Sequence, residues 1–157
     1  MFKGFEPVYT KTSKVLILGS FPSVKSREVD FYYGNPRNRF WTTIGNIHGV
    51  KIGNSIEEKI QFLKSHDIAL WDIVGRCNIE GSMDTNIRDE EIVDLGPILR
   101  ETSLKAIFLN GQKSYSLFMR KYSSLEIRKV LLPSTSPANV RFDEKEWFNA
   151  FESINVR

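Results

Sequence analysis

The chain has 157 residues, 41% hydrophobic and 26% charged, which is typical of a globular protein that buries its own core, so we expect one domain spanning residues 1–157. Its 22 lysines and arginines against 19 acidic residues give a net charge of +3, which is compatible with a polyanionic partner but does not require one. The single cysteine, Cys77, excludes an internal disulfide, and no apolar run has the length of a membrane span or a signal-peptide core, so we expect a cytoplasmic protein without a membrane segment.

Short apolar runs that end at glycine, proline or a polar residue predict four buried strands. Residues 1–13, before the first run, are predicted to be an irregular lead-in that packs on the edge of the domain. The predicted strands are residues 15–18, 68–71, 104–109 and 129–132.

Helical spacing of apolar residues recurs between these runs. A polar loop after Pro22 is predicted to lead into a helix that begins near Pro36. Ser55 and Glu58 form a capping-box pattern at the start of another helix, and Asp143 is predicted to cap the last one. Further helices are predicted at residues 97–101 and 112–121.

Residues 75–89 show no clear period, and we predict a long loop there, followed by a helical segment at residues 90–95. The alternation of strands and helices elsewhere predicts an α/β fold, with a central four-stranded parallel sheet covered by helices on both faces. Ligands of such sheets bind outside the carboxyl ends of the strands. Four polar segments leave those ends and should therefore meet: residues 19–22, the segment that begins at Asp72, residues 110–111, and residues 133–139.

Several kinds of chemistry lack the residues they need. The chain has no Walker loop and no GxGxxG pattern for phosphate binding. His48 and His66, the only histidines, fall at predicted helix ends away from the strand-end face, so we expect surface or capping roles and no metal site. Ser20 comes after a strand but lacks the GxSxG context of an acyl-transfer nucleophile.

Two separated motifs resemble the uracil-DNA glycosylase superfamily, and the hypoxanthine-DNA (deoxyinosine) glycosylase branch in particular. The motifs are GSFP at residues 19–22 with YGNPRNRFW at 33–41, and LPSTSPAN at 132–139. The resemblance covers most of the chain and implies the superfamily's three-layer α/β sandwich. It also implies a monofunctional enzyme without a cofactor or metal that hydrolyses the bond between a deaminated base and its deoxyribose in DNA.

The resemblance implies that the base is turned out of the duplex into a pocket, where a positioned water meets an oxocarbenium-like sugar. Asn38 is the first candidate for positioning that water, because Phe21 stands where relatives often carry Asp or Asn. The alternative for Asn38 is a helix N-cap. Asp72 is the second catalytic candidate, and its alternative is a loop cap.

The resemblance also assigns the binding roles. Tyr33 matches the aromatic residue that stacks on the flipped base. Backbone amides in the segment of Ser20, Phe21 and Pro22 are candidates to read a carbonyl of that base, because Gly19 lets the main chain approach, although Pro22 itself has no amide hydrogen. The second motif supplies phosphate contacts (Ser134, Thr135, Ser136) and a wedge for the DNA stack (Pro137, Ala138, Asn139). Arg37, Arg39 and Arg141 are further candidates for phosphate contacts.

The expected partner is DNA that contains a deaminated base, bound by a monomer. A non-catalytic nucleic-acid-binding module of the same fold is the alternative, and it predicts salt-sensitive binding without release of a base. The motif residues leave open whether hypoxanthine or uracil is preferred, since both present a carbonyl beside an N–H.

Overall fold

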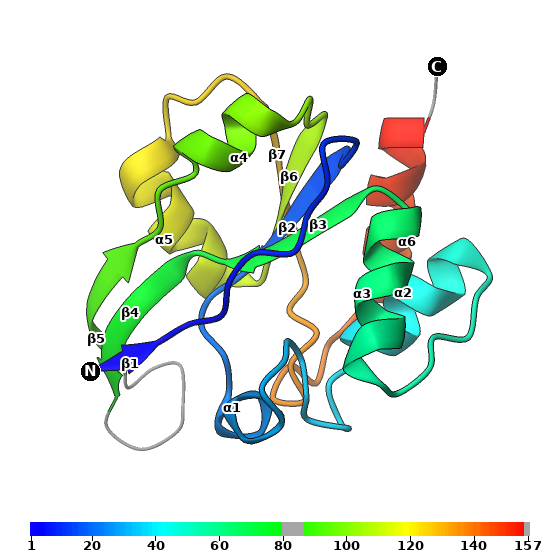
Figure 1. Ribbon diagram of the computed structural model, residues 1–157, viewed down its shortest axis with the longest axis horizontal. Helices are drawn as coiled ribbons and strands as arrows, with labels where there is room; N and C mark the ends of the chain where they lie inside the picture. Colours follow the sequence, from blue (N-terminus) through cyan, green and yellow to red (C-terminus); the bar gives the residue numbers. More distant parts are fainter. Residues whose placement is uncertain (80–86, 156–157) are drawn as a thin grey trace.

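A four-stranded parallel sheet forms the centre of the protein (Figure 1). The structure is a computed structural model that describes residues 1–79 and 87–155. Along the sheet the order is β3-β2-β6-β7, and all three neighbouring pairs are parallel, as predicted for an alternating α/β chain. The strands are β2 (Val15–Gly19), β3 (Ile68–Asp72), β6 (Ala106–Asn110) and β7 (Arg128–Leu132).

The strand register aligns the carboxyl ends of the sheet. Gly19 at the end of β2 pairs with Asp72 at the end of β3, and Asn110 at the end of β6 pairs with Leu132 at the end of β7. The polar segments after these residues therefore leave the sheet along one edge, as the sequence predicts.

Helices cover both faces of the sheet, which confirms the three-layer α/β architecture (Figure 1). A parallel strand must be apolar throughout when both of its faces are buried, and residues 15–18 of β2 are all at most 1% exposed. Ile17 joins the core beneath one helical layer, whereas Leu16 and Leu18 join the core beneath the other. The first layer contains α2 (Phe40–His48), α3 (Ile56–Ser65) and α6 (Glu144–Asn155), and the second contains α4 (Gly96–Glu101) and α5 (Gln112–Tyr122).

A second, antiparallel sheet stands where the sequence predicted a loop at 75–89 and a helical segment at 90–95. It has the order β1-β4-β5 and contains β1 (Phe2–Lys3), β4 (Val74–Ile79) and β5 (Ile87–Ile92). Both predictions were wrong because these strands are half exposed and carry charged residues, so they show no continuous apolar run. β1 lies in the segment that was predicted to be an irregular lead-in, and it pairs with β4. The part of the predicted loop at 80–86 lies outside the described residues.

The start of α2 is also later than predicted. The segment thought to be a polar loop contains a short helix, α1 (Val24–Val29), which Ser23 caps by accepting a hydrogen bond from the N–H of Ser26. Between α1 and α2, the side chains of Asn35 and Asn38 accept hydrogen bonds from backbone N–H groups two residues ahead. Such side-chain bonds hold turns rather than helix, so α2 begins at Phe40 and not near Pro36.

The start of α3 and the C-terminal ends of α2 and α3 agree with the predictions from the sequence. Ser55 and Glu58 form both bonds of the predicted capping box at the start of α3. His48 ends α2 and His66 is the C-cap of α3, and each places Nδ1 within 3.0 Å of the carbonyl four residues earlier, so both histidines lie at helix ends as predicted. None of the helices in the described ranges is long and apolar enough to cross a bilayer.

Candidate functional site

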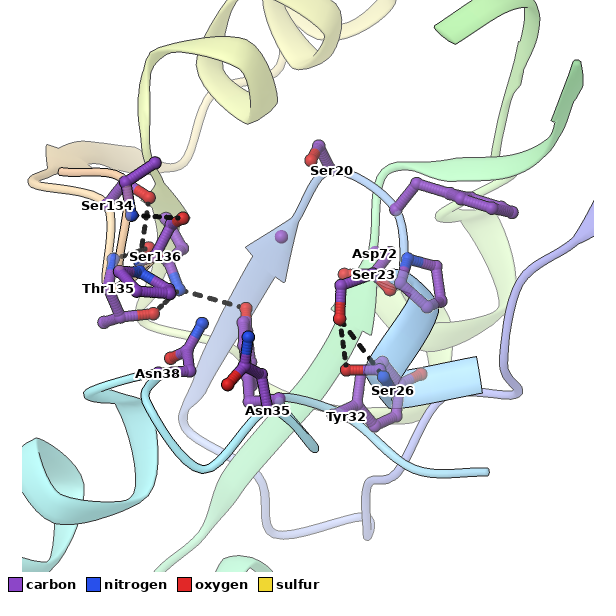
Figure 2. A pocket seen from close by; sticks show the side chains of 17 residues that line it. Ser20, Ser23, Ser26, Tyr32, Asn35, Asn38, Asp72, Ser134, Thr135 and Ser136 are labelled. Carbon is purple, nitrogen blue, oxygen red and sulfur yellow. Dashed lines mark hydrogen bonds between the residues drawn. The ribbon is translucent and has the colours of Figure 1, made fainter. Parts of the chain in front are cut away.

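A cavity of about 360 Å³ opens at the carboxyl ends of the parallel strands (Figure 2). Its volume is in the range of small-molecule binding sites. All of the predicted catalytic, base-binding and second-motif residues line this cavity except Asn139, whereas the candidate phosphate contacts Arg37, Arg39 and Arg141 lie outside its lining. The lining residues are Gly19, Ser20, Phe21, Pro22, Ser23, Ser26, Tyr32, Tyr33, Asn35, Asn38, Asp72, Asn110, Ser134, Thr135, Ser136, Pro137 and Ala138.

Gly19 forms the floor of the cavity where β2 ends. A Cβ atom at this position would lie 2.5 Å from Oδ1 of Asp72 and 2.7 Å from the hydroxyl of Tyr33, closer than real Cβ atoms approach other atoms. Glycine is therefore required for these two polar groups to lie against the end of the strand. Asp72 is only 5% exposed, so its carboxylate belongs to the cavity wall rather than to the open surface.

Tyr33 has an unusual backbone conformation for an aromatic residue, with φ of 53°. Its ring stacks on Phe40, with 4.1 Å between ring centroids and 21° between planes, and Phe40 is fully buried. The hydroxyl accepts a hydrogen bond from the side chain of Asn110 over 3.0 Å. A core ring and a buried amide thus fix Tyr33 while it lines the cavity, and strained residues of this kind cluster at functional sites.

Asn38 lies between the Tyr33 segment and the start of α2. Its Oδ1 accepts a hydrogen bond from the backbone N–H of Phe40 over 2.9 Å, but the N-cap position of α2 is Arg39, so Asn38 holds the preceding turn and is not the helix N-cap. The side chain also lines the cavity, where Figure 2 shows it beside the segment that carries Ser134, Thr135 and Ser136. The same side chain therefore holds the turn before α2 and lines the cavity.

Asn110 is a residue of the site that the sequence did not single out. It is 8% exposed at the end of β6, and both ends of its amide are used. Nδ2 donates to the hydroxyls of Tyr33 and Thr135, each over 3.0 Å, and Oδ1 accepts the backbone N–H of Thr135 over 3.0 Å. Asn110 therefore joins the two motifs. The sequence signal was its place among the four strand ends, but an Asn-Gly pair after a strand also marks an ordinary turn.

Residues 134–139 form a compact turn at the rim of the cavity. The backbone N–H of Ser136 donates to the hydroxyl of Ser134, and that of Ala138 donates to the hydroxyl of Ser136. Asn139 donates from Nδ2 to the carbonyl of Ser134 over 2.9 Å, so its side chain closes the turn instead of lining the cavity. Thr135 is 1% exposed and held by Asn110, whereas Ala138 is exposed at the rim.

Four further lining residues escaped the sequence analysis: Ser23, Ser26, Tyr32 and Asn35. Ser23, Ser26 and Tyr32 lie between the predicted segments 19–22 and 33–41, where a polar loop offered no pattern, and Asn35 lies within the motif at 33–41 but was assigned no role in the site. Burial, together with the negative charge of Asp72 as a smaller cause, raises the pKa of Tyr32, whose hydroxyl donates to the carbonyl of Glu6 over 2.6 Å. Tyr32 is therefore a neutral hydrogen-bonded wall residue.

The cavity offers amide, hydroxyl and carboxylate groups together with an aromatic ring. Neither histidine is among its lining residues, and in the described parts of the chain no three side chains of the metal-ligating types His, Cys, Asp and Glu come together. These groups suit the binding of a flat, polar ring and the placing of a water molecule.

Comparison with known proteins gives a consistent result. Residues 6–155 match the family described as the Uracil DNA glycosylase superfamily. Two curated relatives are named Hypoxanthine DNA glycosylase. The protein of Methanosarcina acetivorans is 37% identical over 95% of this chain and 97% of its own length, and that of Methanosarcina barkeri is 34% identical over 96% and 98%.

A solved structure agrees in fold over almost the whole length. It is a solution NMR structure of a Methanosarcina acetivorans protein assigned provisionally as a uracil DNA glycosylase, with a TM-score of 0.86, 35% identity and coverage of 98% of each chain. With the family match over residues 6–155 and relatives above 30% identity across both full lengths, this chain belongs to the uracil DNA glycosylase superfamily.

Proposed function

We propose that this protein is a monofunctional DNA glycosylase that hydrolyses the N-glycosidic bond of a deaminated base in DNA, with hypoxanthine as the preferred base and uracil as a second one. The observation that carries the proposal is the meeting of Asn38, Tyr33 and residues 134–138 at one cavity. The names of the two Methanosarcina relatives supply the choice of hypoxanthine.

In this proposal the base leaves the duplex and enters the cavity against Tyr33. The ring of Tyr33 already stacks on Phe40 on one side, so a base can extend that stack on the cavity side. Backbone groups of residues 19–22 read the edge of the base, and the absence of a side chain on Gly19 allows a close approach.

Hydrolysis then requires the bond from the base nitrogen to C1′ of the sugar to break, with a water oxygen forming the new bond to C1′. Asn38 holds this water, since a carboxamide both donates and accepts hydrogen bonds. The carboxylate of Asp72 stabilises the positive charge that develops on the sugar. The base leaves with its electron pair and takes up a proton, and the water loses a proton as its oxygen bonds to C1′, so the products are a free base and an abasic site.

The remaining roles belong to the turn 134–139. Ser134 and Ser136 lie at the rim and contact the phosphates beside the lesion, Thr135 supports the turn from inside, and Pro137, Ala138 and Asn139 form the part that meets the DNA stack. We infer that residues 1–157 act as one domain and as a monomer in the cytoplasm, without a cofactor or metal.

The test uses duplexes that contain one deoxyinosine or one deoxyuridine, with an undamaged duplex of the same sequence as control. After incubation with the protein, alkali cleaves the strand wherever a base has been released. We expect scission of the deoxyinosine duplex, weaker scission of the deoxyuridine duplex and none of the control. Salt-sensitive binding to all three duplexes without scission would contradict the proposal and indicate a non-catalytic binding module.

A further inference from the structure

Arg39 connects the two motifs by three hydrogen bonds, and in each of them it donates to a backbone carbonyl. Its backbone N–H donates to the carbonyl of Thr135 over 3.0 Å. Its side-chain Nη1 donates to the carbonyl of Ser136 over 3.1 Å and to that of Asn139 over 2.9 Å. These three carbonyls belong to the turn 134–139. Arg39, which directly follows Asn38 in the chain, therefore contacts this turn at three points.

The guanidinium of Arg39 is also covered by an aromatic ring. It lies over Phe142, 5.1 Å from the ring centroid, and the residue is only partly exposed. A guanidinium stacks on aromatic rings and carries several N–H donors in one rigid plane, so it can hold two carbonyls of an irregular segment at once. By contrast, Arg37 and Arg141 are exposed, as a phosphate contact should be.

We propose that Arg39 is a positioning residue that holds the turn 134–139 in the shape that meets DNA, and that it is not one of the phosphate contacts. This inference rests on the proposed glycosylase function. It changes the role that sequence reasoning gave to this arginine, since its charge faces carbonyl dipoles instead of the nucleic-acid backbone.

The consequence concerns extrusion of the base. Ala138 lies exposed on this turn, at the rim of the cavity, where it meets the duplex when a base leaves the stack. A turn that is already ordered loses no conformational freedom in that step, whereas a loosened turn must be ordered at the same time as the base pair breaks. Loss of Arg39 should therefore slow the release of a well-paired base more than the release of a base without a pairing partner.

The experiment compares Arg39→Met with Arg37→Met in the full-length protein. Methionine keeps the length and the packing against Phe142 but removes the charge and the donors. Each variant and the wild type are assayed for single-turnover base release from two duplexes, one with deoxyinosine opposite cytosine and one with deoxyinosine opposite an abasic-site analogue. The salt dependence of binding to the cytosine duplex is measured in parallel.

We expect Arg39→Met to reduce the rate on the paired substrate by about tenfold or more, as two lost charged hydrogen bonds allow, with a much smaller loss on the unpaired substrate. The slope of the logarithm of the binding constant against the logarithm of the salt concentration (the salt slope) should match that of the wild type. Arg37→Met should lower the slope by about one while leaving the ratio of the two rates unchanged. A lower salt slope in Arg39→Met with an unchanged rate ratio would overturn the inference, and so would an equal loss of rate on both substrates.

Arg39→Lys keeps the experiment decisive if the methionine variant does not fold. Lysine keeps the charge but not the planar arrangement of donors. If Arg39 is a positioning residue, Arg39→Lys should lower the ratio of the rate on the paired duplex to the rate on the unpaired duplex. Wild-type behaviour of this variant would show that charge alone is needed and would overturn the inference. Absence of base release by the wild type on both duplexes would instead contradict the proposed function itself, so the two failures are distinguishable.

Discussion

The side-chain oxygen of Asn38 accepts the backbone N–H of Phe40 over 2.9 Å, which fixes the orientation of the amide at the cavity wall. Since this bond identifies the oxygen, the other end of the amide is the NH₂ group. The oxygen keeps a second lone pair, so Asn38 can both accept from and donate to a water molecule while it caps the turn before α2. The cap thus orients the group that we assign to the water.

Replacement of Asn38 by alanine should reduce single-turnover base release by about 100-fold or more, which is the range found when one positioned hydrogen-bonding group is removed from an active site. The variant should also lose about 1 kcal/mol of unfolding free energy because the cap to Phe40 is lost. Ser55→Ala is the control for stability, since it removes a similar cap at α3, outside the cavity lining, and should leave the rate unchanged. Full activity in Asn38→Ala together with an inactive Asp72→Ala would assign the water to Asp72 instead.

Gly19→Ala should abolish base release, because the new methyl group would collide with Asp72 and Tyr33. We expect a loss of about 1–3 kcal/mol of unfolding free energy from this overpacking, measured by urea denaturation. Gly49→Ala is a matched control. Gly49 has φ of 66° and nothing within 4 Å of its would-be Cβ, so its substitution costs about 1 kcal/mol of backbone strain without touching the cavity. Equal activity of the two variants would show that the close approach at Gly19 has no role.

Asn110→Asp should separate the two ends of this amide. Aspartate keeps an acceptor for the N–H of Thr135 but cannot donate to the hydroxyls of Tyr33 and Thr135. We expect base release to fall by about tenfold or more, as expected for the loss of donors that fix Tyr33. Ser114→Ala, which removes a buried hydrogen bond to the carbonyl of Leu18, should lower stability by about 1 kcal/mol but preserve the rate. A similar fall in rate for Ser114→Ala would mean that loss of stability alone explains the effect.

His48 predicts a pH dependence of stability that is separate from the reaction. Burial is the main cause that lowers the pKa of His48 below the ordinary 6.5, and the neighbouring His66 adds to this, whereas a hydrogen bond to the carbonyl of Ile44 opposes it. As the pH falls below 6.5 the unfolded chain takes up this proton before the folded protein does, so the free energy of unfolding decreases in that range. His48→Gln should lessen the difference in stability measured between about pH 7.5 and pH 5.5. An identical difference in the wild type and the variant would contradict this origin.

The sequence was sufficient to predict the parallel sheet, because a strand buried on both faces must be apolar along its length, and β2 and residues 106–109 of β6 meet this condition. It also predicted the meeting of the strand ends, which is a consequence of topology alone. It was insufficient for β5, where only Ile87 is buried among charged neighbours, because a strand that pairs at a solvated edge leaves little trace in composition.

For the site, the sequence predicted which residues take part but not which groups they contact. The motifs identified Asn38 and Tyr33, and the structure places both at the cavity. Sequence alone could not show that Arg39 donates hydrogen bonds to carbonyls of a segment 100 residues away, or that Asn110 bridges Tyr33 and Thr135. Such bonds depend on which chain segments the fold brings together, and no local pattern records them.

The measurement that tests the central claim most directly is the release of free hypoxanthine from a duplex with a single deoxyinosine, with chromatography of the base and alkaline scission of the strand as the two readouts. We predict equal amounts of released hypoxanthine and cleaved strand for the wild type, and neither product for Asn38→Ala within the same time. Intact duplex after long incubation with folded, DNA-bound wild-type protein would contradict the claim.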